Sequence, residues 1–243
     1  MFLKTIALAI LPTTVTADKL LNPLPPNASD GAFKFQPLLD FDTNTCYHTA
    51  AIDAGGNINE GMRPSGGVSF CRSEDRLWHC NTYSREKCNH YWCAYMYAYY
   101  SEMDYAGWTG GHRHDWEHVI VWALHNEVKY VSWSAHGDYT TKYHTEVRFD
   151  GTRPKFVAHH GYFNTGSLRR ATEDDEKIEN HLGKWFTGHL VSMEKMNPDL
   201  AKKLNEESFG SAHLDLRDDR FSAALEEAMP WDAKNNEGFD PHA

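Results

Sequence analysis

Two runs of alternating residues constrain the fold of this chain more than any other feature. In residues 92–102, one parity holds Cys93 and three tyrosines, and the other holds alanine, methionine and Tyr100. Residues 116–124 alternate in the same way, with two valines following Glu117 on one face. Period-two runs rich in aromatic and β-branched residues are typical of strands in a pleated sheet. We therefore expect both runs to be β-strands.

The rest of the chain predicts further strands and a few helices. Short strands are expected at residues 128–134, 146–150 and 155–159. Helices are expected only in the last third, one beginning near Pro198 and one over residues 219–229. No internal repeat or linker divides the chain. The predicted fold is therefore mainly β, a single-domain β-sandwich with peripheral helices in the C-terminal third.

The composition excludes one class of partner. The 243 residues carry a formal charge of −10 and are 41% hydrophobic, which is an ordinary globular composition with enough apolar residues for one core. A protein that binds nucleic acid needs clustered Lys and Arg to neutralise phosphates, and this acidic chain has no such cluster. We therefore expect no nucleic-acid partner.

The two ends of the chain differ from its middle. Residues 1–17 have a positively charged start, a short apolar stretch and a small-residue cleavage site, so they are predicted to be a signal peptide. The protein is then secreted and extracellular. Residues 18–32 are expected to form a flexible, Pro-rich arm with a glycosylation sequon at Asn27. Residues 33–231 would be the folded domain, and residues 232–243 a polar tail.

Secretion also determines how the cysteines are interpreted. An oxidising compartment favours disulfides over zinc thiolates. The chain has five cysteines, so at least one thiol is free or paired with another molecule. Four cysteines allow three connectivities, and the spacing alone does not choose among them.

The densest cluster of ligand-type side chains is the heptapeptide at residues 111–117, Gly-His-Arg-His-Asp-Trp-Glu. Asp115 and Glu117 are two residues apart, so on a strand both carboxylates project from the same face. His112 follows a Gly-Gly turn, and Asp104 ends the Tyr-rich strand eight residues earlier. If the two strands pair through the Gly-bounded loop between them, all four side chains meet at one end of a sheet. Such oxygen donors suit Ca²⁺ or Mg²⁺, whereas imidazole suits transition metals better.

A structural explanation of the same cluster is also open. Arg113 and the carboxylates would then form an ion-pair network that steadies a β-turn, since structural ion pairs also cluster charges. On the strand, His114 and Trp116 face the other way, and Trp116 is expected to pack in the core. The two histidines are two residues apart, so the segment is not the His-Glu-x-x-His motif of zinc proteases.

The heptapeptide resembles the hallmark sequence of the necrosis- and ethylene-inducing peptide 1-like proteins, secreted toxins of fungi, oomycetes and bacteria. The resemblance covers residues 33–230, which is nearly the whole predicted mature chain. Other segments that resemble the family, in the family's order, are residues 35–42, 83–85, 94–97 and 209–210.

The resemblance implies a β-sandwich like that of actinoporins and fungal lectins, and a virulence effector that damages membranes rather than an enzyme with catalytic residues. It implies peripheral contact with plant plasma membranes through the sugar head groups of glycosylinositol phosphorylceramides. A divalent cation, Ca²⁺ or Mg²⁺, would lie in the cleft, and we expect a monomer in solution. Carried over by position, the metal ligands are Asp104, His112, Asp115 and Glu117. The other motif residues, expected to support the site, are Gly111, Arg113, His114 and Trp116.

The cysteines resemble those of the type 2 branch of the family. This resemblance implies two disulfides, Cys46–Cys71 and Cys88–Cys93. Cys80 would then be a free thiol, which we expect to be buried and inert.

Two loops near the heptapeptide bear on the contact with the membrane. Trp108, Phe163 and His159 are candidates for that contact, because aromatic side chains favour the membrane interface. Gly161 and Gly166 stand where the family pattern leads us to expect an Asp and a His. A non-cytotoxic secreted relative, acting as an immune elicitor or in development, is therefore an alternative. A further alternative is a metal-dependent hydrolase of cell-wall polysaccharide, since carboxylates near a divalent ion can serve as acid and base.

Overall fold

The computed structural model describes residues 20–64, 67–106, 110–135, 137–161, 165–236 and 238–243. The predicted signal peptide and the candidate membrane contacts Trp108 and Phe163 lie outside the described residues. Among the described residues, no helix is long and apolar enough to cross a membrane.

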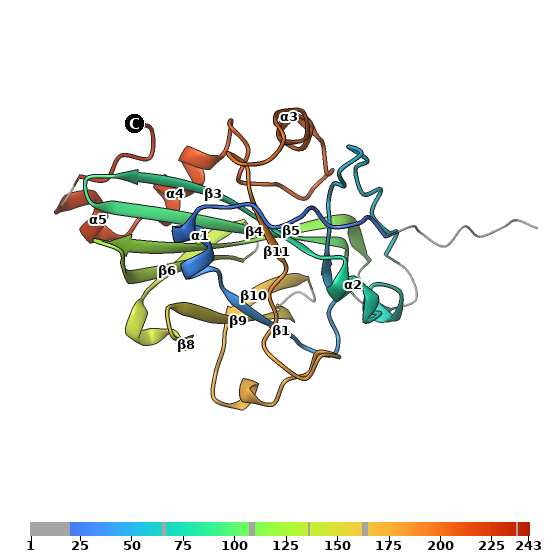
Figure 1. Ribbon diagram of the computed structural model, residues 1–243. Coiled ribbons are helices and arrows are strands. Elements are labelled where there is room, and N and C mark those ends of the chain that lie inside the picture. Colours follow the sequence, from blue (N-terminus) through green and yellow to red (C-terminus); the bar gives the residue numbers. More distant parts are fainter. Residues whose placement is uncertain (1–19, 65–66, 107–109, 136, 162–164, 237) are drawn as a thin grey trace, which may run out of the picture.

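Two β-sheets form the framework of the protein (Figure 1). In the larger sheet the strand order is β11-β3-β4-β5-β6-β7, and β2 pairs with β4. Its strands are β2 (His48–Thr49), β3 (Asn81–Asn89), β4 (Trp92–Tyr105), β5 (Gly111–Leu124), β6 (Glu127–Ala135), β7 (Asp138–Tyr143) and β11 (His189–Ser192). In the smaller sheet the order is β1-β9-β10, and β8 pairs with β9. Its strands are β1 (Leu38–Phe41), β8 (Phe149–Asp150), β9 (Arg153–His160) and β10 (Gly166–Arg170).

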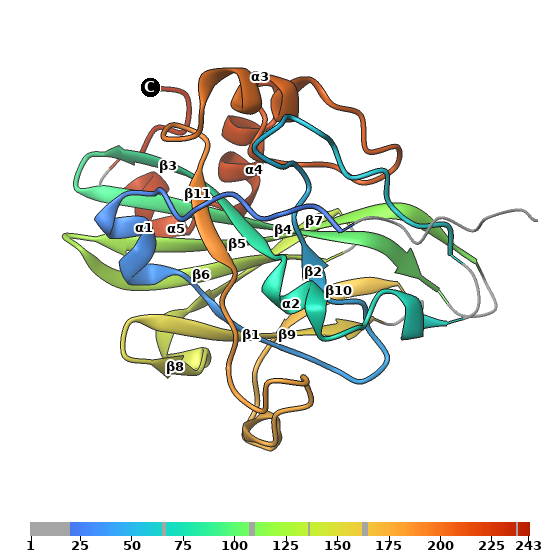
Figure 2. The ribbon, with the colours of Figure 1, turned by 45° about the vertical axis from the view of Figure 1, so that its right-hand side comes forward.

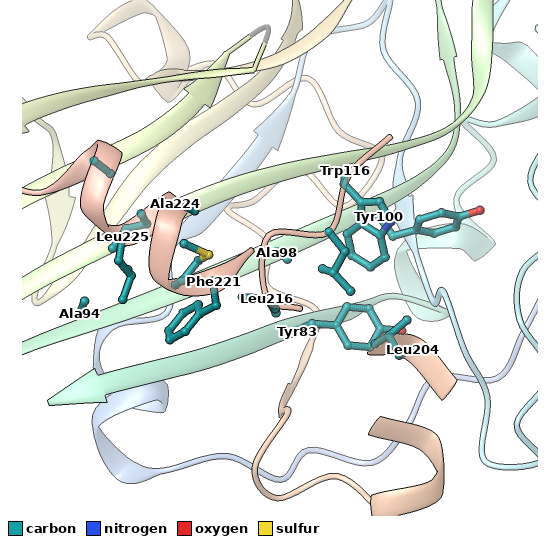
Figure 3. Packing of buried hydrophobic residues seen from close by; sticks show 14 of the residues in the cluster. Tyr83, Ala94, Ala98, Tyr100, Trp116, Leu204, Leu216, Phe221, Ala224 and Leu225 are labelled. Carbon is teal, nitrogen blue, oxygen red and sulfur yellow. The ribbon is translucent and has the colours of Figure 1, made fainter. Parts of the chain in front are cut away.

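The predicted alternation of β4 and β5 is confirmed, and it gives the protein two hydrophobic cores. Tyr97 of β4 and Val119 of β5 pack in the core between the two sheets. Met96 and Trp116, on the opposite faces of these strands, pack in a second core against the C-terminal segments. Figure 3 shows this second core, in which Trp116 and its neighbours lie between the large sheet and the helical layer. The fold is thus mainly β, as expected.

Three described α-helices follow the last strand in the chain: α3 (Pro198–Glu206), α4 (Phe221–Ala228) and α5 (Trp231–Asn235). They lie on the outer face of the large sheet, away from the small one (Figures 1 and 2). Asn197 caps α3 by accepting a hydrogen bond from the Asp199 amide at 2.9 Å, as the Asn-Pro signal predicts. Two short helices, α1 (Asp30–Phe35) and α2 (Asp75–Trp78), lie earlier in the chain and were not predicted.

Several strands carry no clear signal in the sequence. β3 is mostly polar, yet it pairs with β4 along eight residue pairs, and β7 and β10 are short and polar as well. These strands form because they pair with neighbouring strands, and not because their own residues favour the β conformation. The prediction of a strand at residues 146–150 is wrong for its first part. A 3₁₀ turn covers His144–Glu146, and only Phe149–Asp150 form a strand, β8.

The two ends of the described chain are more ordered than predicted. The expectation of a flexible arm is wrong from Leu24 onward, because Leu24 is buried and exchanges two hydrogen bonds with the Asn81 side chain. Asn27 is exposed, and its main chain pairs with β11. At the other end, Phe239 is buried, so the segment predicted to be a polar tail contributes to the core.

The cysteine pairing agrees with the resemblance. Disulfides join Cys46 to Cys71 and Cys88 to Cys93, and the second one links the neighbouring strands β3 and β4. Cys80 is a buried free thiol. Burial raises the pKa of this thiol far above its usual value, which keeps it protonated and unreactive.

Candidate binding site

The hairpin of β4 and β5 brings the predicted site residues together. Asp104 lies opposite His112 in the strand pairing, and Asp115 and Glu117 lie further along β5, opposite Ser101 and Tyr99. The prediction that the two strands pair through the Gly-bounded loop is therefore confirmed. All four candidate ligands line one cavity of about 340 Å³.

An irregularity in the hairpin sets which way these side chains point. Under strict alternation Asp104 would face away from Ser101, three residues before it, and therefore away from Asp115. The pairing is irregular at this point: Met103 lies opposite both Arg113 and His114, and His114 has a positive φ of 62°. Bulges of this kind re-aim side chains next to functional sites. Here the bulge lets Asp104 share a cavity with Asp115.

Each carboxylate is held by a neighbouring donor. The Gly166 amide of β10 donates to Asp104 Oδ1 at 2.6 Å, so the small sheet reaches into the site. The Trp116 amide donates to Asp115 Oδ1 at 3.0 Å. The Ser134 hydroxyl donates to Glu117 Oε2 at 2.6 Å. These bonds orient the carboxylates without neutralising their charge.

The cluster has more buried negative charge than the described residues balance. Burial, and then the charge of Asp104, raise the pKa of Asp115 to about 7, while His112 opposes this shift. Burial, and then the charge of Asp115, also raise the pKa of Glu117 well above its usual value. His112 Nε2 lies 3.6 Å from Asp104 Oδ2. Three carboxylates in one pocket would bind a cation or proton to relieve this repulsion.

The other motif residues have structural contacts. Gly111 has a φ of 106°, and a side chain there would collide with the main-chain oxygen of Asp104. Arg113 donates to the main-chain oxygens of Glu60 and Gly61 at 2.6 and 3.1 Å, so it is held by the backbone of a neighbouring loop and not by the carboxylates. The Arg113–carboxylate network is therefore not the reason for the charge cluster.

His114 and Trp116 face away from the carboxylates, as predicted. His114 Nδ1 is 2.6 Å from the hydroxyl of Tyr100, and burial, followed by the charge of Arg113, lowers the pKa of His114 to about 4. Trp116 packs against Tyr100 and Phe209 in the helical-side core. Both residues brace the strand from behind the site.

A second polar wall closes the same cavity on the side of the C-terminal segment. Asp215 lies at its centre: it accepts hydrogen bonds from Tyr139 Oη and Arg220 Nε, both at 2.8 Å, and its own amide donates to His118 Nε2 at 3.0 Å. Burial alone would raise the pKa of Asp215, but the charge of His118 and the hydrogen bonds outweigh it and lower the pKa. No local motif in the sequence indicates this wall, because Asp215 and Arg220 lie about 100 residues after the heptapeptide.

A smaller hollow of about 20 Å³ lies behind the carboxylates. It shares Asp104, Asp115, Glu117 and Gly166 with the main cavity. His159, a candidate membrane contact, is half-buried in β9, with Nε2 at 3.1 Å from the Ser167 hydroxyl, and it lines this hollow. Its role at a membrane stays a prediction.

The donor set fits a hard divalent cation by type and charge, since carboxylate oxygens are the ligands that Ca²⁺ and Mg²⁺ prefer. The positions of the side chains fit it less closely. Among the described residues, no three His, Cys, Asp or Glu side chains are grouped as a ready-made metal site. Binding an ion would therefore require the side chains to draw together. The His112 side chain is partly exposed, and its Nδ1 lies 2.7 Å from the main-chain oxygen of His114. The metal ligands stay a prediction.

Comparison with known proteins identifies the family. The family model of the necrosis inducing protein (NPP1) matches residues 29–228. "NLP effector protein 10" of Phytophthora capsici is 28% identical over 204 residues, which cover 81% of this chain and 82% of that protein.

Solved structures share the fold. "NLPPya in complex with mannosamine" matches with a TM-score of 0.73 and 27% identity, covering 86% of this chain and 96% of the other. The "non-toxic HaNLP3 protein" matches with a TM-score of 0.74 and 27% identity, covering 87% and 98%. The assignment to the type 2 branch stays a prediction. The family match spans both sheets and the whole carboxylate cluster, and the chain therefore belongs to the necrosis inducing protein (NPP1) family.

Proposed function

We propose that this protein is a secreted effector that binds sugar head groups of plant plasma-membrane sphingolipids, the glycosylinositol phosphorylceramides, and damages the membrane. The observation that carries the proposal is the cluster of Asp104, Asp115 and Glu117 in a cavity large enough for a small sugar. A volume of about 340 Å³ lies at the lower end of the range of ~300–1,000 Å³ for small-molecule sites. The amino-sugar complex of the related NLPPya supports the same class of ligand.

The carboxylates and His112 would hold a divalent cation, Ca²⁺ or Mg²⁺, and the cation would supply open coordination positions for sugar hydroxyls. The protein residues hold this wall in place. Gly166 anchors Asp104, and Ser134 anchors Glu117, so the carboxylates face the cavity before a ligand arrives. Such hydrogen bonds to ligating carboxylates typically contribute about 10- to 100-fold in metal affinity.

Sugar recognition must provide most of the affinity for the membrane. The chain has a formal charge of −10, so an anionic lipid surface repels it rather than attracts it. The aromatic candidates Trp108 and Phe163 would add contact at the interface after the head group is bound.

A second candidate function is recognition without lysis. The fold matches the non-toxic HaNLP3 as well as it matches NLPPya, so the fold alone does not separate the two activities. In this alternative the protein acts as an immune elicitor or in development. The hydrolase alternative would require reducing sugars to appear when the protein is incubated with cell-wall material.

Dye release from vesicles tests the proposal. Vesicles of phosphatidylcholine with plant glycosylinositol phosphorylceramide should release dye in the presence of Ca²⁺ or Mg²⁺, and vesicles of phosphatidylcholine alone should not. Asp104→Asn and Glu117→Gln should abolish binding to the sphingolipid vesicles and lower the affinity for the cation. Glu127→Gln is the matched control, because Glu127 is exposed and pairs only with Lys129 among the described residues. Vesicle binding without dye release would establish the non-lytic alternative. Equal binding by the parent protein and both site variants would refute the proposed site.

A further inference from the structure

The cavity has a second polar wall besides the one formed by the candidate metal ligands. It consists of Tyr139, Asp215 and Arg220, and it faces the same cavity as the carboxylates. Asp215 is well shielded, with 14% of its side chain exposed, whereas 40% of the Arg220 side chain is exposed. This wall therefore presents a fixed acid behind an accessible guanidinium.

The contacts of Arg220 fix the plane of its guanidinium. Nε donates to Asp215 Oδ1 at 2.8 Å, and Asp215 is itself fixed by the Tyr139 hydroxyl at 2.8 Å. A guanidinium has five N–H donors in one plane, and this ion pair occupies the Nε side. The terminal nitrogens lie at the end of a side chain that is held in place before a ligand binds. A planar fork held in this way matches the two oxygens of a carboxylate or a phosphate.

The ion pair accounts for the position of Arg220 Nε. A pair in which 40% of one side chain is exposed stabilises the fold less than a fully buried one, because solvent screens it and the long side chain loses entropy. Arg217 shows what a simple surface pair looks like in the same segment: it pairs with Asp219 and with the main-chain oxygen of Glu207, and it does not line the cavity.

We propose that Arg220 forms an anion subsite, so that the cavity prefers a sugar with a carboxylate or phosphate substituent over the neutral sugar. This inference rests on the proposed sugar site. The sugar hydroxyls face the wall of Asp104, Asp115 and Glu117, and the anionic substituent faces Arg220. One wall presents carboxylates to the ligand and the other presents the Arg220 guanidinium, so the two walls also set its orientation.

The test compares three soluble probes by nuclear magnetic resonance titration in the presence of Ca²⁺: glucose, glucuronate and glucose 6-phosphate. The parent protein should bind at least one anionic probe about tenfold more tightly than glucose, the size expected for one charge-assisted bidentate contact. Tighter binding of glucuronate would indicate a carboxylate ligand, and tighter binding of glucose 6-phosphate would indicate a phosphate ligand. Arg220→Gln should remove the preference, so that the three probes bind with similar affinities. Arg220→Lys keeps the charge without the fork and should keep only part of the preference.

Arg217→Gln is the control, and it should bind all three probes like the parent protein. Thermal unfolding of each variant checks that the fold is intact. The inference is overturned if the parent protein binds glucose and the anionic probes equally, or if Arg220→Gln keeps the full preference. In either case glucose still binds, so the proposed sugar site stands. Failure of all three probes to bind would instead refute the sugar site itself.

Discussion

Gly166 packs so closely against the carboxylates that a single methyl group there should disrupt the site. In Gly166→Ala, the added Cβ would lie 2.9 Å from Asp115 Oδ2 and 3.3 Å from Asp104 Oδ1. The φ angle of Gly166 is outside the left-handed region, so alanine can adopt the same backbone. The effect of the substitution is therefore one of packing and not of backbone strain.

The magnitude follows from two opposing terms. Gly166 is half-buried beside buried carboxylates, and overpacking of a core costs about 1–3 kcal/mol of folding free energy. The loss of backbone freedom in the unfolded chain returns about 0.4–1 kcal/mol. We expect a net loss of about 1–2 kcal/mol in the free energy of unfolding. Because Asp115 must move to make room, we also expect cation affinity to fall about tenfold or more.

Urea denaturation measures the first effect, and calorimetric titration with Ca²⁺ and Mg²⁺ measures the second. Gly55→Ala is the matched control, because Gly55 is exposed and does not line the cavity, and its Cβ would meet the side chains of Asn57 and Asp53 at 3.2 and 3.3 Å. A Gly166→Ala protein that is as stable as the parent and binds cations equally well would refute the argument that β10 is closely packed against the carboxylates.

Three further predictions concern the core. Burial lowers the pKa of His48 to about 3, below its unfolded value of about 6.5. The neutral ring therefore contributes stability that is lost as the pH falls from about 6.5 towards 3. His48→Gln should flatten the measured dependence of the unfolding free energy on pH between these values. The native protein should not react with a thiol reagent such as dithionitrobenzoate, and in denaturant it should show one thiol, from Cys80; fast reaction of the native protein would contradict its burial. Arg76→Leu should lower the unfolding free energy by about 3–5 kcal/mol, because it leaves the buried carboxylate of Glu102 without its partner, Arg76 Nε at 2.7 Å. Adding Glu102→Leu should recover part of this loss. If the double variant recovers nothing, the ion pair does not contribute as argued.

The alternation in the sequence predicts the centre of the fold well. Tyr97 and Met96 lie in different cores, as their parity requires, because β4 is buried on both faces. The outer strands are less visible in the sequence. β3 is polar and is stabilised by pairing with β4, which sequence periodicity does not report. The order of the N-terminal arm is not visible in the sequence for the same reason, since the Leu24 amide donates to Asn81 Oδ1 and Asn81 Nδ2 donates to the Leu24 carbonyl.

The candidate site was predicted only where it is local in sequence. The hairpin pairing of Asp104 with His112 follows from the length of the loop between them. The bulge at Met103 does not follow from the sequence, although it decides which face Asp104 occupies. Gly166 and Arg220 come from the small sheet and from the segment before α4, and only tertiary packing brings them to the cavity.

The bond from the Gly166 amide to Asp104 has a consequence for how the site assembles during folding. The β4–β5 hairpin can form early, because its contacts are close in sequence, but Asp104 and Gly166 are separated by 62 residues. The wall that carries Arg220 follows later still in the chain. A nascent chain emerging from the ribosome therefore carries the complete heptapeptide long before the cavity around it is complete. The cavity is complete only when β10 and the C-terminal segment that carries Arg220 have docked on the hairpin.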